Sequence, residues 1–553
     1  MTCEKSVQDK NMMFPIMLLK LIEWVVFKLF AISCYKAAMK VKNYYAFYLK
    51  SPSSKSSYLQ VPSYPSVSKC DLQNRESQTI VCDMHGSLLR SNSFFPFFML
   101  IAFEGGSIFR AFLLLLASPF LLFLHFELKL RVMTFITFCG LNKKYVEMVG
   151  RAVFPKFYLE NLNRHAYEVL ASSGVKMVFT SMPRVMVEGF LKEYLSVDDV
   201  IGTELQMVGN YFTGFMTNSG MLVKHKALKE IFGEKKPDVG IGSSCSHDHL
   251  FISQCKEAYV VDKEDIKSGS KSSSIILPRE KYPKPLIFHD GRLAFLPTPL
   301  ATLAMFMWLP LAIPLAVFRI AVGALPVKIA LLLGCSSGID VKVKFVNNQN
   351  SPKSSKIKNG SGVLYVCTHR TLLDPVMLSA SLQRPLSAVT YSLSKVTEII
   401  APIKTVRLTR NRQTDGEKMA KFLSEGDLVV CPEGTTCREP YLLRFSSLFA
   451  ELTDEIVPVA INTHVTMFYG TTASGMKCLD AIFFFMNPKP SYYIQILEKL
   501  PREMTCGGGK SSHEVANYIQ RQLGDVLGFE CTNLTRKDKY LMLAGNDGLV
   551  KGR

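Results

Sequence analysis

The sequence is short of paired cysteines and of acidic residues. Its 14 cysteines stand singly and no CxxC pair occurs, which excludes a disulfide framework and a cysteine-based zinc site. We therefore expect reduced thiols and a catalytic part that faces the cytosol. Acidic residues number 46 against 65 lysines and arginines, so the formal charge is +19.

Although it is basic, the chain is 48% hydrophobic and has a mean hydropathy of +0.15. Such a composition buries enough apolar surface to exclude a disordered protein. Nucleic acid is not expected as a partner, because the lysines and arginines are not grouped with stacking aromatics. Basic and apolar character together favour an anionic membrane surface or a phosphorylated, acyl-bearing substrate.

The N-terminal region is predicted to lie at a membrane. Residues 12–39 are apolar but interrupted by charges such as Lys20, Glu23 and Lys28, with Trp24 as a potential interfacial anchor. This pattern favours a membrane helix within 1–50 that lies on the surface more than it spans. The alternative is a helix packed on the protein's own core. No small-residue cleavage site follows, which argues against a signal peptide. Residues 51–78 are rich in Ser and Pro and indicate a linker.

Two further apolar segments indicate membrane-embedded helices. The stretch 94–135 is an apolar helical insert, interpreted as a domain cap, a membrane anchor or both. Residues 300–318 carry no charge over 19 positions, close to the roughly 20 residues that cross a bilayer. Within 290–335 we expect a membrane-embedded hairpin kinked at Pro310 and Pro314, because proline in a membrane helix frees a carbonyl. The number of crossings is left open.

Residues 336–530 show short β-branched runs that alternate with helical segments, followed by a C-terminal tail at 531–553. This spacing predicts an α/β fold with a largely parallel sheet. Reactive groups in such sheets gather at the carboxyl ends of the strands. His369 ends one apolar run and Asp374 follows five positions later, directly before Pro375. Either His369 is a general base that Asp374 orients, or Asp374 is a helix cap and His369 a surface residue.

A second polar turn, Pro432-Glu433-Gly434-Thr435, follows the apolar run LVVC. Cations lie close to it in sequence, and arginine suits forked contacts with phosphate oxygens. They are Lys404, Arg407, Arg410, Arg412, Arg438 and Arg444. A solvated basic face is the alternative, although Arg410 continues an apolar run that is predicted to be a strand.

These blocks, with Ile456-Val457-Pro458-Val459, resemble in order the four motifs of the glycerolipid acyltransferase superfamily. The fuller wording, such as CTHRTLLDPV and DLVVCPEGTTCREPYLLRF, is similar to the land-plant sn-2 glycerol-3-phosphate acyltransferases. The resemblance implies that His369 takes a proton from glycerol 3-phosphate, which attacks acyl-CoA, and that Asp374 orients the imidazole. It further implies roles in substrate binding for Arg410, Glu433, Gly434, Thr435 and Pro458. Lys404, Arg407 and Thr436 depart from the usual pattern, so the phosphate contacts stay open.

Residues 79–265 resemble the haloacid dehalogenase-like phosphatases, whose first motif is Asp-x-Asp-x-Thr. Here it is Asp83-Met84-His85-Gly86-Ser87, and His85 stands where an acid is needed. Ser181 matches the second motif, one of Lys224, Lys226 and Lys229 the third, and Ser243 replaces a magnesium carboxylate while Asp248 keeps another. Because magnesium prefers carboxylate oxygens, we expect no metal here, no phosphatase activity and no cofactor.

The expected fold class is thus α/β and membrane-associated. A haloacid dehalogenase-like Rossmannoid domain precedes an αβ acyltransferase domain, with apolar membrane-embedded helices. The resemblance implies synthesis of lysophosphatidic acid for plant extracellular lipid of the cutin or suberin type, or for membrane glycerolipids. The alternatives are a lysophospholipid acyltransferase and a catalytically silent membrane scaffold. The expected partners are glycerol 3-phosphate, acyl-CoA and a lipid bilayer, of the endoplasmic reticulum or else of mitochondria.

Overall fold

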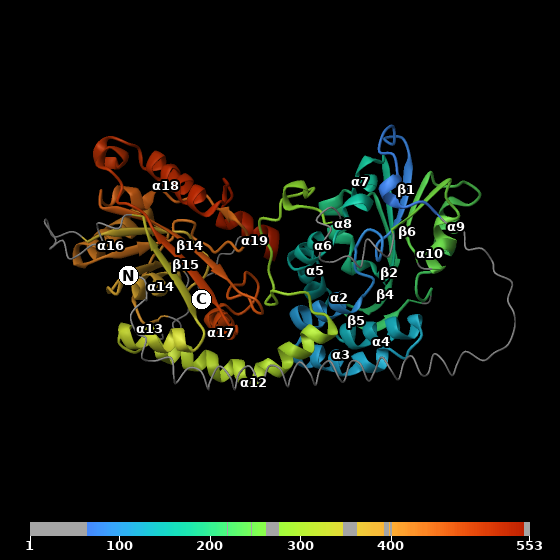
Figure 1. Ribbon diagram of the computed structural model, residues 1–553, viewed down its shortest axis with the longest axis horizontal. Coiled ribbons are helices and arrows are strands. Elements are labelled where there is room, and N and C mark those ends of the chain that lie inside the picture. The colour runs from blue at the N-terminus through green and yellow to red at the C-terminus, as the bar shows by residue number, and fades with distance from the viewer. Residues whose placement is uncertain are drawn as a thin grey trace, which may run out of the picture.

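The computed structural model describes residues 64–217, 219–244, 246–261, 276–346, 362–391, 398 and 401–546. The N-terminal helix predicted within 1–50 lies outside these residues, as does the first part of the linker predicted at 51–78. The two larger β-sheets lie side by side along the long axis of the molecule, and a long helix runs beneath the C-terminal half as far as the lower helices of the N-terminal half (Figure 1).

The N-terminal sheet has five strands in the order β3-β2-β1-β6-β7, and all of its pairs are parallel. Its central strand β1 reads TIVCD, and the four residues that follow the first threonine are buried. Such an apolar run is typical of a strand covered on both faces. The strands are β1 Thr79–Asp83, β2 Val175–Pro183, β3 Asp199–Thr203, β6 Val239–Ser243 and β7 Glu257–Val261, with a separate hairpin of β4 Leu205–Val208 and β5 Tyr211–Met216.

A helical insert separates β1 from β2, and it is longer than predicted because its helices continue beyond residue 135. All six residues of α2 are buried, whereas α3 exposes large apolar side chains such as Phe109 and Phe120, at 77% and 71%. The insert comprises α2 Phe95–Leu100, the π-helical η2 Ile101–Gly106, α3 Ile108–Leu121, α4 Phe126–Phe138, α5 Lys143–Ala152, α6 Phe154–Glu160 and α7 Arg164–Ser172. Helices α8 Glu188–Leu195, α9 Lys224–Phe232 and α10 Ser246–Ile252 complete this part.

The predicted hairpin does not turn at Pro310 and Pro314, because helix α12 continues through both prolines from Pro299 to Val322. The chain turns only after Gly323, and α13 follows at Val327–Ser336. Two polar side chains fasten α12 to the protein. The Trp308 indole donates to the Met486 carbonyl at 2.7 Å, and the buried Arg319 guanidinium donates to four carbonyls, those of Ser337, Phe485, Asn487 and Pro488. These bonds hold α12 against the C-terminal part of the protein.

The C-terminal sheet has seven strands in the order β11-β10-β12-β9-β14-β15-β8. The first five are parallel, while β15 runs antiparallel to β14. Alternate residues of β9 face opposite layers: Leu364 and Val366 pack under α18, and Tyr365 and Cys367 join the core that contains α14. The strands are β8 Asp340–Phe345, β9 Leu364–Cys367, β10 Ser387–Thr390, β11 Lys404–Arg407, β12 Leu428–Val430, β14 Ile456–His464 and β15 Ser491–Ile496, with the pair β13 Tyr441–Leu442 and β16 Glu530–Cys531. The helices are α14 Asp374–Leu382, α16 Arg412–Glu425, α17 Asp480–Phe485 and α18 Ser512–Leu527.

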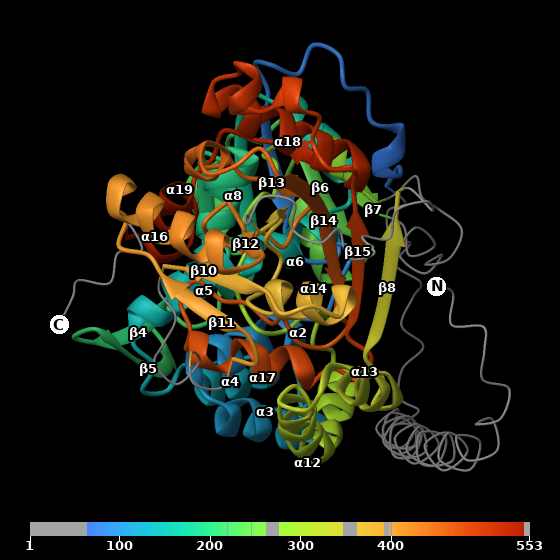
Figure 2. The same ribbon diagram turned by 90° about the vertical axis from the view of Figure 1, so that its left-hand side faces the viewer.

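Part of the predicted C-terminal tail is folded. Helix α19 spans Arg536–Ala544 and begins with a capping box between Thr535 and Asp538. Its buried residues Tyr540 and Leu543 pack with Ala152 of α5, so the helix bridges the two halves of the molecule. Figure 2, viewed along the long axis, shows α19 and α5 on the same side of the C-terminal sheet.

A buried polar junction also joins the two halves. The Glu104 carboxylate of the insert accepts the N–H groups of Arg292 and Leu293, at 2.6 and 2.9 Å. Asp290, a few residues earlier, accepts the N–H groups of Ala473 and Ser474 in the C-terminal part. Buried carboxylates bonded in this way are costly to separate, so the N-terminal part fixes the position of the C-terminal one.

Candidate active site

The predicted His369–Asp374 pair lies at the carboxyl edge of the C-terminal sheet. Strand β9 ends at Cys367, and His369 follows in the loop to α14. Its Nδ1 lies 3.1 Å from Asp374 Oδ2, so the buried carboxylate accepts the Nδ1 proton. This bond leaves the lone pair on Nε2, for which the described residues offer no hydrogen-bond partner, and the side chain is 15% exposed.

Asp374 does not act as the helix cap of the alternative interpretation, since α14 has no side-chain cap bond. Its Oδ2 accepts instead the N–H groups of Arg370 and Thr371, at 2.6 and 2.8 Å. Its Oδ1 accepts the hydroxyls of Thr371 and Tyr492, at 3.0 and 3.3 Å. With this many donors the carboxylate is fixed in place, and it organises the loop and the imidazole together.

Glu433 points into the protein and not toward open space. Its two oxygens accept the N–H groups of His369, at 2.8 Å, and of Leu443, at 3.0 Å. Burial raises the pKa of this carboxyl to about 6, although both bonds oppose the shift. The turn at 432–436, here called the Glu433 turn, therefore holds the backbone of His369, and the Cys437 N–H donates to the His369 carbonyl at 3.1 Å.

Other predicted residues occupy different positions. Gly434 has a φ of +66°, and a side chain built there would meet nothing within 4 Å, so its backbone borders open space. Thr435 is buried beside it, and Pro458 is buried within β14, paired with Val366 of β9. No described contact ties Pro458 to a position for acyl-CoA.

The basic run at 404–412 is mostly engaged in ion pairs. Lys404 pairs with Glu425 at 3.0 Å, Arg407 with Glu398 at 2.9 Å, and Arg412 with Glu451. Arg410 is exposed and has no ion pair within the described residues; it follows β11 in a turn with a φ of +71°. The expectation that Arg410 lies in a strand is therefore wrong, because β11 ends at Arg407.

The two remaining arginines of the block differ. Arg438 is buried against Tyr469 and Asp290, and Arg444 is exposed. Sequence reasoning missed Lys539 of α19, whose ammonium reaches the Glu433 turn from a segment predicted to be a tail. The only sequence signal was the capping box that begins α19, which predicts a helix but not its position.

The phosphatase-like residues gather at the end of β1, as predicted, and Lys224 supplies the cation of the third motif. Its ammonium lies 2.9 Å from Asp83 and also contacts Asp248. Burial lowers the pKa of Lys224, but the two carboxylates more than offset this and raise it above its usual value. Asp248 also accepts the N–H and the hydroxyl of Ser243, while Ser181 lies within β2 and donates to the Leu222 carbonyl.

Neither His85 nor the carboxylates suit magnesium chemistry. His85 is enclosed by Phe94 and Phe97, and burial lowers its pKa to about 3. Near neutral pH its imidazole is therefore uncharged and is not the acid that the phosphatase reaction needs. An ammonium stands between Asp83 and Asp248 where a magnesium site needs oxygen ligands. Among the described residues no three acidic, histidine or cysteine side chains are grouped to hold a metal ion. The donor set does not fit magnesium.

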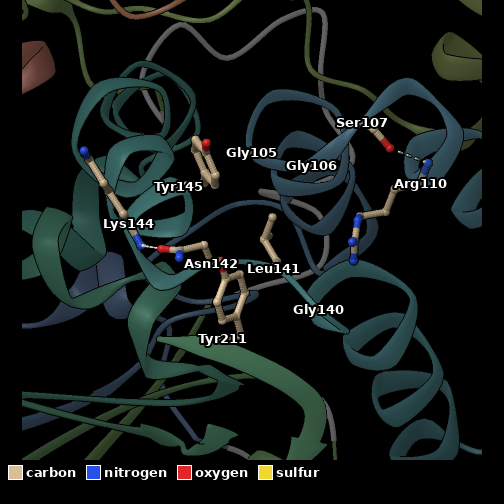
Figure 3. A pocket seen from close by; sticks show the side chains of 10 residues that line it. All are labelled: Gly105, Gly106, Ser107, Arg110, Gly140, Leu141, Asn142, Lys144, Tyr145 and Tyr211. Carbon is tan, nitrogen blue, oxygen red and sulfur yellow. Dashed lines mark hydrogen bonds between the residues drawn. The ribbon is translucent and has the colours of Figure 1, made fainter. Parts of the chain in front are cut away.

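A cavity of about 330 Å³ lies elsewhere, in the helical insert (Figure 3). Gly105, Gly106 and Arg110 line one side, and Tyr145 and Tyr211 the other. The Arg110 guanidinium already donates to three carbonyls at the end of α4, those of Ile136, Thr137 and Cys139. Because its cation is engaged, we assign this cavity no role in catalysis.

Comparison with known proteins identifies both halves. Residues 79–261 match the family described as "Glycerol-3-phosphate acyltransferase RAM2-like, HAD-like domain", and residues 342–462 match the family described as "Acyltransferase". Among solved structures, the 1-acyl-sn-glycerophosphate acyltransferase PlsC from Thermotoga maritima aligns at 17% identity with a TM-score of 0.26, over 36% of this chain and 80% of that one. A likeness this remote carries no argument about activity.

Curated plant proteins are far more similar. Glycerol-3-phosphate acyltransferase 1 of Arabidopsis thaliana is 54% identical, over 98% of this chain and 100% of that one. Glycerol-3-phosphate acyltransferase RAM2 of Petunia hybrida is 51% identical, over 84% of this chain and 97% of that one. Identity at this level along nearly the whole length confirms the resemblance drawn from the motifs. The chain belongs to the plant glycerol-3-phosphate acyltransferase family, in which a HAD-like domain precedes an acyltransferase domain.

Proposed function

We propose that this protein transfers an acyl group from acyl-CoA to glycerol 3-phosphate, at the sn-2 hydroxyl, and releases lysophosphatidic acid and CoA. The main support for this proposal is the His369–Asp374 pair, in which Nε2 of His369 keeps a lone pair available at the edge of the sheet. Family membership supports the substrates. The product would serve cutin- or suberin-type extracellular lipid, or membrane glycerolipids.

The reaction follows from the protonation state of the pair. Nε2 of His369 accepts the hydroxyl proton as the oxygen attacks the thioester carbonyl, and Asp374 stabilises the imidazolium that forms. The tetrahedral intermediate then expels CoA as its thiolate, which takes up a proton. The Glu433 turn keeps His369 in position through the 2.8 Å backbone bond. Because the hydroxyl attacks the thioester directly, the reaction requires no covalent acyl-enzyme and no cofactor.

The experiment is a product analysis of the purified full chain with defined acyl-CoAs. We expect release of CoA and accumulation of 2-acyl lysophosphatidic acid when glycerol 3-phosphate is the acceptor. A preference for lysophosphatidate as acceptor would make the protein a lysophospholipid acyltransferase instead. No release of CoA with any acceptor would favour a silent scaffold. Monoacylglycerol as the main product would contradict an inactive phosphatase-like part.

We also propose that the apolar lower face seats the enzyme on the endoplasmic reticulum, with the active site toward the cytosol and a mitochondrial membrane as the alternative. Helix α12 is long and apolar enough to cross a bilayer. It nevertheless lies along the C-terminal half and reaches α3 of the N-terminal half (Figure 1). There Phe306 packs against Phe112 of α3 at 5.4 Å between ring centroids. Large apolar side chains are exposed on α3, α12 and α13, including Leu311 at 58% and Leu332 at 69%. Such a continuous face is typical of binding to a lipid surface.

Vesicle flotation tests this face. The substitution Leu311→Asp should lower the fraction of protein that floats with anionic vesicles, because a carboxylate replaces an inserting side chain. Ile231→Asp on α9 is the matched control, since Ile231 is 49% exposed and lies away from the lower edge (Figure 1). Equal flotation of both variants would contradict the proposed face. Co-localisation of a fluorescent fusion with markers of the two organelles decides between the membranes.

A further inference from the structure

Helix α19 inserts a lysine into the acyltransferase part. The buried residues of this helix are Lys539, Tyr540 and Leu543. Lys539 is only 6% exposed. Because long cationic side chains are almost never buried without a reason, its surroundings define its role.

All the contacts of the Lys539 ammonium are with the Glu433 turn, and all are with neutral oxygens. It donates to the Thr436 carbonyl at 2.5 Å, to the Thr436 hydroxyl at 3.2 Å and to the Thr435 hydroxyl at 3.4 Å. Within the described residues it makes no ion pair. Its hydrogen bonds are therefore satisfied, but its charge is not balanced.

Three other cations with little exposure are paired with carboxylates, whereas the buried Arg319 and Arg370 donate to neutral oxygens only. Lys156 contacts Glu160 at 2.8 Å, Lys224 contacts Asp83 and Asp248, and Arg292 lies 2.8 Å from Asp480. A buried charge without a partner is costly. Lys539 thus differs from the other two lysines, Lys156 and Lys224, and an anion from outside the chain would balance its charge.

The charged groups around Lys539 do not supply that anion. The carboxylate of Asp290 acts on the Lys539 charge, but it is already bonded to Arg438 and to the N–H groups of Ala473 and Ser474. Arg438 and Lys477 add positive charge, and the Cys437 thiol stays protonated because burial raises its pKa to about 11. The carboxylate of Glu433 is bonded to two backbone N–H groups. The surroundings are therefore suited to receiving negative charge.

The turn that Lys539 contacts also holds the proposed base. Glu433 accepts the His369 N–H, and Cys437 donates to the His369 carbonyl. Between these two anchors, Gly434 borders open space. An anion bound at this turn would lie beside the loop that carries His369.

We propose that Lys539 is a binding residue for the phosphate of glycerol 3-phosphate at the Glu433 turn, supplied by the C-terminal helix. This inference rests on the proposed function and adds to it the cation that recognises the acceptor. It also gives the HAD-like part a task, because α19 packs on α5 of that part. The scaffold of the former phosphatase thereby positions a substrate contact of the acyltransferase.

The test is steady-state kinetics of Lys539→Met, which keeps the length of the side chain without its charge. We expect the KM for glycerol 3-phosphate to rise at least tenfold, because a charge-assisted contact with phosphate is lost, while the KM for acyl-CoA changes less than twofold. Lys537→Met is the matched control, since Lys537 is exposed on the same helix. An unchanged KM for glycerol 3-phosphate, or an equal loss for both substrates, would overturn the inference.

A second measurement uses the wild-type chain, so it does not depend on the folding of a variant. Burial lowers the pKa of Lys539 to about 8, so the ammonium is charged below that pH and neutral above it. The KM for glycerol 3-phosphate should therefore rise between about pH 7.5 and 9, because the ammonium loses its charge within roughly one pH unit of this pKa. A lysine that only fastens α19 would leave this KM flat with pH. If the wild type fails to release CoA with glycerol 3-phosphate at all, the proposed function fails first.

Inorganic phosphate distinguishes the headgroup from the whole acceptor. It should compete with glycerol 3-phosphate in the wild type and raise the melting temperature of the full chain. In Lys539→Met both effects should be lost, while in Lys537→Met they should persist. Equal stabilisation of the two variants by phosphate would place the anion elsewhere and overturn the assignment.

Discussion

Each half of this protein has a buried aspartate after its central parallel strands, Asp83 at the end of β1 and Asp374 at the start of α14, and the two aspartates have different surroundings. Asp83 is neutralised by Lys224, which it shares with Asp248. Asp374 is bonded to backbone N–H groups, to hydroxyls and to an imidazole that keeps one nitrogen available. The charges around Asp83 are paired with each other, whereas the bonds around Asp374 lead to His369, whose Nε2 is able to accept a proton. A strand-end carboxylate thus indicates a former or a present site only after its partners are known.

The largest effect on catalysis is expected when Nε2 of His369 is removed. His369→Ala should lower kcat about 10³-fold, within the range for loss of a general base, with little change in thermal stability because the side chain is partly exposed. CoA release is the measurement. His464→Ala is the control, since His464 is exposed at the end of β14. Near-normal CoA release by His369→Ala would remove the distinction between the two sites.

In the site around Asp83 the expected effect is on stability and not on catalysis. Lys224→Met leaves two buried carboxylates without a cation, which costs about 3 kcal/mol or more. Thermal unfolding at pH 7 should show this loss, and the exposed Lys226→Met should not. The rate of acyl transfer per folded molecule should stay unchanged.

The same variant should regain stability as the pH falls. Burial already raises the pKa of Asp83 to about 7 with Lys224 present, well above the value of about 3.9 for an unfolded chain. The folded state therefore binds more protons than the unfolded state between these values, so stability increases as the pH falls from 7 toward 5. A deficit that is independent of pH would mean that the carboxylates are not what destabilises Lys224→Met.

One substitution applied to both aspartates sharpens the comparison further. Asp374→Asn should lower kcat about 10²-fold, because an amide does not stabilise the imidazolium and favours the wrong tautomer of His369. Asp83→Asn should leave kcat within twofold of the wild type. Both side chains are buried, so thermal unfolding of each variant controls for folding. Equal kinetic losses at the two positions would indicate a structural role for both.

Local sequence patterns were enough to predict the strands and the residues at their ends. β-branched runs followed by polar turns correctly predicted β9, β12 and β14, and the parallel order then brought His369 next to Glu433. The direction of the Glu433 carboxylate was not predictable, because it depends on the N–H groups of His369 and Leu443, which donate to it from other parts of the chain. Lys539 lies 103 residues from Thr436, and no local pattern encodes a contact of that separation. Helix α12 continues through both prolines, and its anchors Trp308 and Arg319 bond to carbonyls more than 160 residues away, which no local pattern encodes.

The smallest expected effect concerns Arg410, a cation that is available and held in a strained turn. Its φ of +71° costs a residue with a side chain about 1 kcal/mol, which glycine avoids. Arg410→Gly should therefore raise the melting temperature slightly, while the KM for glycerol 3-phosphate rises severalfold if the exposed guanidinium contacts phosphate. Gln383→Gly is the matched control, since Gln383 has a φ of +53° at the end of α14 and should gain stability without a change in KM. If Arg410→Gly alone both raises the melting temperature and raises the KM for glycerol 3-phosphate, the strained turn is kept because it positions the Arg410 charge. An unchanged KM would leave Arg410 a solvated residue and Lys539 the principal phosphate contact.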